Sequence, residues 1–227
     1  MIRFIPTTHG AGVRLWGSEE DLRAFYEMVL CYWDLEESTP DPIELQRSNF
    51  LAGICYDIRH AFMGTRSIAK KHPVEKTPGI FYGVEFTWTH ILFFFAILRH
   101  NMRTRPCTRK GIELVCRAEN SLYEAVRKYS KRYADAVMPF LNGAIYCNNP
   151  YLEQYIETIN NQHLNNLSLL SPKRAFGLLV DDLNSAVYNT NGYKEILGYL
   201  QKEAKRLDCD IVDLTYDYGA PPYDFQW

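Results

Sequence analysis

The strand-like segments of this chain are concentrated in its first 90 residues, and helical patterns dominate almost everything after Thr89. Strands and helices that occupy separate stretches favour an α+β fold, in which helices pack against an antiparallel sheet. We therefore predict a small, largely antiparallel sheet from the N-terminal half, packed with about five to six helices, and a helix-rich C-terminal half. The 227 residues contain no low-complexity linker, which predicts a single domain over 1–227. Its parts are a β-containing part (about 1–90), a helical part (about 91–207) and an aromatic, acidic tail (208–227).

Three segments of the β-containing part have strand character. Arg3–Ile5 and Val13–Trp16 are short strand patterns joined by turn residues, so a hairpin is the simplest interpretation. Ile80–Trp88 is rich in β-forming residues and is also predicted as a strand. The apolar positions of 50–60 fit a helix and a strand alike. A strand is slightly favoured because it would give Ile80–Trp88 a partner, and an isolated two-stranded hairpin is only marginally stable.

Helical signals are clearest where a capping residue precedes an apolar stripe. Ser18 and the acidic residues after it predict a helix over 18–33. An apolar stripe from Val115 to Tyr133 predicts one long helix that ends before Pro139 and has a strongly basic opposite face. The other segments predicted in this way are helices over 150–166, 172–187 and 192–207, a loop over 36–47 and a short final strand over 211–214.

The chain contains neither a secretory signal pattern nor a membrane-spanning pattern. Its N-terminus breaks at Pro6 before any long apolar stretch, and the longest apolar run, Ile91–Leu98, is far shorter than the roughly 20 residues that cross a bilayer. The six cysteines include no C-x-x-C pair and should remain reduced in a protein that is not exported. These features predict a soluble, cytoplasmic protein with no membrane association.

Familiar cofactor and metal motifs are incomplete in this sequence. The segment His9-Gly10-Ala11-Gly12 begins like a dinucleotide-binding loop, but Leu15 stands in place of the third glycine and a strand pattern follows. The six histidines include no closely spaced pair of the kind that zinc sites use. His163 continues an apolar helical line and is interpreted as a hydrogen-bonded histidine at the edge of the core. We therefore predict no cofactor and no metal, and keep His9 only as a candidate ligand-binding residue.

The densest polar cluster is Tyr56-Asp57-Ile58-Arg59-His60, followed closely by Arg66. A histidine beside an arginine and a carboxylate could transfer protons or hold a phosphate. The candidate catalytic residues are therefore Asp57 and His60, and the candidate ligand-binding residues are Tyr56, Arg59, Arg66 and His9. The commoner role of such a cluster is a structural ion pair, for which we expect Asp57 to be partly buried beside the sheet and paired with an arginine.

Charge is unevenly distributed along the chain, although the formal net charge is only −2. Segment 99–132, from Arg99 to Arg132, carries ten Lys and Arg against three Glu, a stripe that could contact phosphates of a nucleic acid. The near-neutral total and the lack of a nucleic-acid motif favour a solvated basic face instead. Residues 208–227 carry five Asp without Lys or Arg, and aromatic residues crowd their second half. We expect this tail to dock on the basic helix or on a second copy.

Short motifs in the N-terminal half resemble a known family. They are Pro6–Val13, Trp16-Gly17 with Asp21-Leu22, and Tyr56–Ala61. In these positions the chain is similar to a bacterial family catalogued as a domain of unknown function, and the likeness covers chiefly the first 100 residues. The resemblance implies a bacterial, cytoplasmic protein and supplies no catalytic residues.

Three classes of function remain open at this point. A non-catalytic binding or interaction protein is the leading hypothesis, because every catalytic signature in the sequence is incomplete. The first alternative is an enzyme that acts on a phosphorylated or nucleotide substrate through Asp57, Arg59 and His60. The second is a nucleic-acid binder that uses the stripe Arg99–Arg132. The aromatic tail also leaves a homo-oligomer open.

Overall fold

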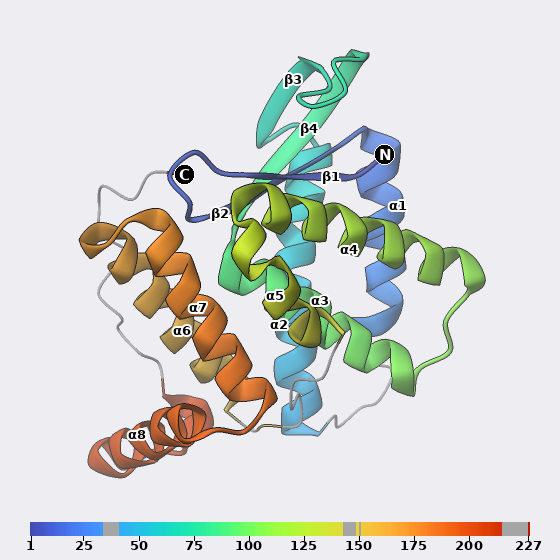
Figure 1. The fold of residues 1–227 in the computed structure, drawn as a ribbon. Helices are drawn as coiled ribbons and strands as arrows, with labels where there is room; N and C mark the ends of the chain where they lie inside the picture. The colour runs from blue at the N-terminus through green and yellow to red at the C-terminus, as the bar shows by residue number, and fades with distance from the viewer. Residues whose placement is uncertain (34–40, 143–148, 150, 215–226) are drawn as a thin grey trace.

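The fold is α+β, as the sequence predicts (Figure 1). The computed structural model describes residues 1–33, 41–142, 149, 151–214 and 227. Within these ranges a four-stranded antiparallel sheet comes from the N-terminal half, and eight α-helices, more than the five to six expected, lie mostly in the C-terminal half. The described helices include none that is long and apolar enough to span a bilayer.

The sheet has the strand order β1-β2-β4-β3, with antiparallel pairing throughout. The strands are β1 (Arg3–Pro6), β2 (Gly12–Gly17), β3 (Ser67–Lys71) and β4 (Pro78–Thr87). The predicted hairpin of β1 and β2 and the predicted strand ending near Trp88 are confirmed. The partners of β4 are β2 and β3, so segment 50–60 does not pair with it. β1 and β3 form the two outer edges of the sheet.

The helices α1, α6, α7 and α8 confirm the predictions made for their segments. The full set is α1 (Glu19–Trp33), α2 (Pro42–Phe62), α3 (Trp88–Thr104), α4 (Arg109–Tyr129), α5 (Lys131–Leu141), α6 (Leu152–Leu169), α7 (Pro172–Val187) and α8 (Asn191–Leu207). The predicted final strand over 211–214 is wrong, because Ile211–Asp213 forms one turn of 3-10 helix.

Helix α2 corrects two predictions, the strand at 50–60 and the loop at 36–47. Asp41 caps the helix by accepting a hydrogen bond from the Ile43 backbone N–H at 3.1 Å, and Pro42 occupies the first turn, where a missing N–H costs nothing. Residues 42–47 are therefore helical, while 34–40 lie outside the described residues. The side chains that repeat at helical spacing are buried, and α2 packs against α1.

The long helix predicted to run to Pro139 is in fact two helices. Ser130 separates α4 from α5 with φ −149° and ψ 95°, an extended conformation that no helix contains. Pro139 lies inside α5, close to its end, so the prediction that proline would end the helix is wrong. The apolar stripe continues across the break because both helices bury the same side, with Val126 before Ser130 and Ala134 after it.

Helix α3 passes through the centre of the molecule and contains the apolar run predicted to be a core segment. Three consecutive phenylalanines contact three different elements. Phe93 packs edge-on against Phe140 of α5, with ring centroids 4.8 Å apart, and Phe94 against Phe25 of α1, at 6.0 Å. Phe95 contacts Phe4 of β1 at 5.9 Å. The sheet and the helices therefore share one core, and β1 is fixed to it through Phe4.

Candidate functional site: a groove between β1 and α4

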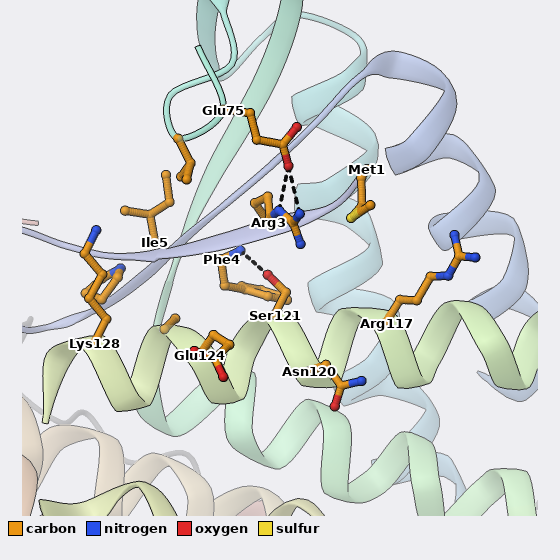
Figure 2. A pocket seen from close by; sticks show the side chains of 13 residues that line it. Met1, Arg3, Phe4, Ile5, Glu75, Arg117, Asn120, Ser121, Glu124 and Lys128 are labelled. Atoms are coloured by element: carbon orange, nitrogen blue, oxygen red, sulfur yellow. Dashed lines mark hydrogen bonds and ion pairs between the residues drawn. The ribbon is translucent and has the colours of Figure 1, made fainter. Parts of the chain in front are cut away.

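A groove of about 690 Å³ lies between β1, α4 and the turn that joins β3 to β4 (Figure 2). Its lining comes from these three elements. They contribute Met1, Arg3, Phe4, Ile5, Pro6, Val74, Glu75, Arg117, Asn120, Ser121, Glu124, Ala125 and Lys128. Apolar side chains of β1 and Ala125 of α4 contribute to the lining. Figure 2 shows the Arg3–Glu75 pair near the centre of the groove and Arg117 and Lys128 toward opposite ends. The groove therefore depends on segments that are far apart in the sequence.

The edge of β1 that borders the groove is closed to further strand pairing. The Phe4 backbone N–H donates to the Ser121 hydroxyl at 3.0 Å, and Pro6 has no N–H to offer. An exposed edge with free donors would invite another strand, and here the helix occupies that position. A ligand in the groove must therefore be recognised through side chains rather than by addition to the sheet at β1.

The turn that forms the upper wall is held by His72. Its Nδ1 accepts hydrogen bonds from the backbone N–H groups of Val74, at 3.3 Å, and Glu75, at 3.0 Å. Burial lowers the pKa of His72, which favours the neutral ring that can accept them. Glu75 then forms an ion pair with Arg3 at 2.8 Å, which joins the turn to β1 across the groove (Figure 2).

The charges of the groove are largely paired, except at one end. Arg117 pairs with Glu113, and Glu124 lies 3.5 Å from Arg127. Among the residues that the structure describes, Lys128 forms no ion pair, and Figure 2 shows its side chain rising beside Ile5. Lys128 and Arg117 are eleven residues apart on α4, which corresponds to roughly 16 Å along the helix. The groove thus combines apolar lining residues with an ammonium group, at one end, that forms no ion pair with any described residue.

Acid/base chemistry has little support in this groove. Its described lining contains no histidine or cysteine, and the one serine hydroxyl accepts the Phe4 N–H bond. Across the described parts of the chain, no group of three or more His, Cys, Asp or Glu side chains could hold a metal ion.

The predicted cluster on α2 lies on an outer face of that helix. The Tyr56 and His60 rings are 4.3 Å apart, and the Arg59 guanidinium lies 5.5 Å from the Tyr56 ring. The Nδ1 of His60 is 2.9 Å from the Thr65 hydroxyl. The helix therefore brings Tyr56, Arg59 and His60 together, which the strand interpretation would not have done.

Asp57 has the predicted arginine partner, with the Arg66 guanidinium at 2.7 Å. The pair is more exposed than expected, because the Asp57 side chain exposes 38% of its surface and the Arg66 side chain 42%. The pair belongs to the end of α2 and the start of β3. His9 lies apart from this cluster, exposed in the turn between β1 and β2. None of the six predicted residues lines the groove.

Comparison with known proteins places this architecture in a family. Residues 2–227 match the family described as Domain of unknown function (DUF6904). The chain belongs to DUF6904. No match was found among curated proteins or among solved structures. The DUF6904 match covers all three walls of the groove as well as the cluster on α2, and so extends well beyond the first 100 residues of the resemblance in the sequence.

The basic stripe of this DUF6904 chain is neutralised in part by its own carboxylates. Arg99 donates to Glu119, with its Nε at 2.6 Å, and Arg105 pairs with Glu44 at 2.8 Å. Two further arginines of the stripe are the ones paired on α4 beside the groove. Of the tail, residues 215–226 lie outside the described residues, and Trp227 exposes 38% of its surface. Docking of the tail on the basic helix stays a prediction.

His163, predicted at the edge of the core, is a buried histidine in this DUF6904 chain. It lies on α6 with only 1% of its surface exposed, near the backbones of Ala175 and Gly10. Burial lowers its pKa to about 4, with the two backbone groups acting in the opposite direction. Neither ring nitrogen has a hydrogen-bond partner of ordinary geometry among the described residues. The predicted place at the core is confirmed, and the backbone groups of Ala175 and Gly10 interact with the ring as hydrogen-bond partners of less than ideal geometry.

Proposed function

We propose that this chain is a non-catalytic binding protein and that the groove between β1 and α4 holds its ligand. The observation that carries the proposal is the groove itself. Its volume of about 690 Å³ is in the range of known small-molecule sites, roughly 300–1,000 Å³, and each of its three walls contributes an apolar side chain. The Arg3–Glu75 ion pair and the hydrogen bond from Phe4 to Ser121 fix its walls before any ligand arrives. A preformed site of this kind loses little entropy on binding.

The lining favours a ligand with an apolar body and an anionic group. Three of its side chains are cationic and two are anionic, and the Arg3–Glu75 pair removes one of each. Arg117 and Glu124 each have a partner on α4 outside the groove. Lys128 is then the cation best placed to meet an anionic group, and the neighbouring Ile5 and Ala125 suit an apolar body.

An enzyme that uses Asp57, Arg59 and His60 has weaker support. The Asp57 carboxylate is engaged by Arg66, and the ring of His60 is stacked against Tyr56. A catalytic group needs a substrate held against it, usually in a concave site. Neither the β1–α4 groove nor the smaller cavity of about 270 Å³ between α1 and the start of α4 is lined by these residues.

A dye with the proposed chemistry tests the groove. Anilinonaphthalene sulfonate combines an aromatic body with a sulfonate, and its fluorescence rises on binding. We expect Val74→Trp to abolish the binding, because Val74 lines the groove, is half exposed and can carry a larger ring into it. Ile80→Trp is the matched control, since it adds the same ring at an exposed position of the same hairpin outside the groove.

The charge of the ligand is tested at Lys128. We expect Lys128→Glu to weaken binding of the sulfonate dye by at least about fivefold, as a difference of about 1 kcal/mol requires. Lys131→Glu, an exposed lysine outside the groove, should leave it unchanged. Equal binding to Val74→Trp and wild type, with both proteins folded by circular dichroism, would show that the groove is not the binding site.

A further inference from the structure

The outer edge of β3 differs from that of β1, because no element of the described parts of the chain covers it. β3 (Ser67–Lys71) is the last strand of the sheet and pairs only with β4. Among the described residues, none of its backbone groups bonds to anything outside that pairing. β1, by contrast, donates its Phe4 N–H to α4. One sheet edge is thus closed within the chain and the other is open to an added strand.

The hairpin of β3 and β4 extends beyond the body of the protein (Figure 1). β2 pairs with β4 only from Tyr82 to Thr87, so residues 78–81 have no third strand beside them. Ile68 stands opposite Tyr82, and Ile80 lies two residues before Tyr82, which puts all three side chains on one face. Ile68 exposes 56% of its surface and Ile80 61%. The open edge therefore borders an exposed apolar face.

The charge beside this edge is positive. Segment 67–81 contains three lysines, at positions 70, 71 and 76, and one carboxylate, Glu75, which pairs with Arg3. Lys70 and Lys71 are exposed and form no ion pair with any described residue. Lysines on an edge strand discourage pairing between identical copies, since like charges placed opposite each other are destabilising. The same lysines would attract a strand that carries carboxylates.

We propose that the β3 edge binds an extended segment of a partner protein in which acidic residues alternate with apolar ones. The backbone of the partner would pair with β3 and add a strand to the sheet. Lys70 shares the face of Ile68, and Lys71 points to the opposite face. The apolar side chains of the partner would cover Ile68 and Ile80, and its carboxylates, on the opposite face, would lie near Lys71. This site is separate from the β1–α4 groove and does not depend on a ligand there.

Fluorescence polarisation with a fluorescein-labelled peptide of alternating Asp and Val tests the proposal. We expect binding that the double substitution Lys70→Glu/Lys71→Glu weakens by at least about tenfold, because the attraction of Lys71 for the carboxylates becomes a repulsion and Lys70→Glu adds a second negative charge to the edge. The matched control is Lys173→Glu/Arg174→Glu at the exposed start of α7, which should bind as wild type does. A peptide with lysine in place of aspartate should not bind. Neither should one with proline in place of valine, which cannot donate backbone hydrogen bonds.

Each remaining outcome contradicts the proposal. One such outcome is that the acidic peptide does not bind at concentrations up to about 1 mM. A second is that Lys70→Glu/Lys71→Glu leaves its affinity unchanged, and a third is that the proline peptide binds as well as the valine peptide. Light scattering could instead show that the wild type is a dimer and that Ile68→Lys dissociates it. That result would assign the β3 edge to a second copy of the chain. An unchanged circular dichroism spectrum and melting transition would show that the Lys70→Glu/Lys71→Glu protein is folded. The peptide assay then tests the β3 edge whether or not the sulfonate dye binds the groove, so the failure of one proposal is distinguishable from that of the other.

Discussion

Replacing His163 by phenylalanine should remove a specific dependence of stability on pH. Burial lowers the pKa of this histidine from 6.5 to about 4, so protonating it in the folded protein is unfavourable. The difference between the two pKa values corresponds to ~3 kcal/mol of folding free energy. Phenylalanine has a ring of similar size and does not titrate, so it keeps most of the packing and removes the proton.

The direction in which stability changes with pH depends on whether the folded or the unfolded state binds the proton first. Above pH 6.5 the histidine is neutral in both states, and its contribution to stability is fully present. As the pH falls below 6.5, His163 of the unfolded chain binds a proton, whereas His163 of the folded protein binds one only near pH 4. Folding stability is therefore lost between about pH 6.5 and pH 4. Among the described residues, no acidic side chain forms a hydrogen bond or ion pair with His163. A positive charge on its ring would therefore be buried without a counter-ion.

The pH dependence that Asp182 gives to folding stability is opposite to that of His163, and the experiment must separate the two. Burial raises its pKa from 3.8 to about 6, so its contribution to stability is present below pH 3.8 and lost as the pH rises through about 6. In the wild type the two residues offset each other over much of the same range. The wild-type profile alone is therefore uninformative, and the useful quantity is the difference between wild type and His163→Phe.

Urea denaturation of both proteins between about pH 4 and 7.5 measures that difference. We expect the stability of the wild type relative to His163→Phe to fall by ~3 kcal/mol from the upper to the lower end of the range. Asp182→Asn should reveal the same histidine-dependent loss in an otherwise wild-type chain. Parallel profiles for wild type and His163→Phe would refute the reasoning, because the histidine would then titrate alike in both states.

Three further predictions concern the groove wall, the ion pair on α2 and the tail. Ser121→Ala should lower the free energy of unfolding, measured by urea denaturation, by about 1–3 kcal/mol, because the Phe4 N–H loses its acceptor. Asn120→Ala is the exposed control, and an equal loss of stability in both variants would contradict this prediction. Asp57→Ala should lower stability by no more than about 1 kcal/mol, since its pair with Arg66 is exposed. A larger loss measured by calorimetry would mean that Asp57 stabilises the fold as a buried ion pair does. Removing residues 216–227 should lower the melting temperature or dissociate an oligomer, whereas unchanged stability and mass would mean that the tail docks on neither.

The elements that the sequence predicted correctly are those whose signals are local. The β1–β2 hairpin has two strand patterns joined by turn residues, and α1 has a capping serine followed by acidic residues. α2 was misread because two prolines suggested a loop, although Asp41 before Pro42 is a good start for a helix. The break at Ser130 has no proline or glycine to mark it, and it exists because α5 must turn to pack against α7.

The groove could not be predicted from the sequence because its three walls meet only in the folded protein. Ser121 and Phe4 are 117 residues apart, and Glu75 reaches Arg3 across 72 residues. One local signal was present: a proline at the end of an outer strand, Pro6, is typical of an edge that must not pair. The ion pair of Asp57 could be predicted because an arginine follows nearby, but its exposure depends on how α2 packs, which the sequence leaves open.

The central claim, that the groove between β1 and α4 is a binding site, is tested most directly by mapping a bound probe on the protein. Backbone amide NMR spectra recorded during a titration with anilinonaphthalene sulfonate give that map. We expect the largest shift changes on Arg3–Ile5 of β1 and on Ser121 and Lys128 of α4, and we expect Val74→Trp to remove them. Changes confined to the outer face of α2, around Tyr56 and His60, would contradict it.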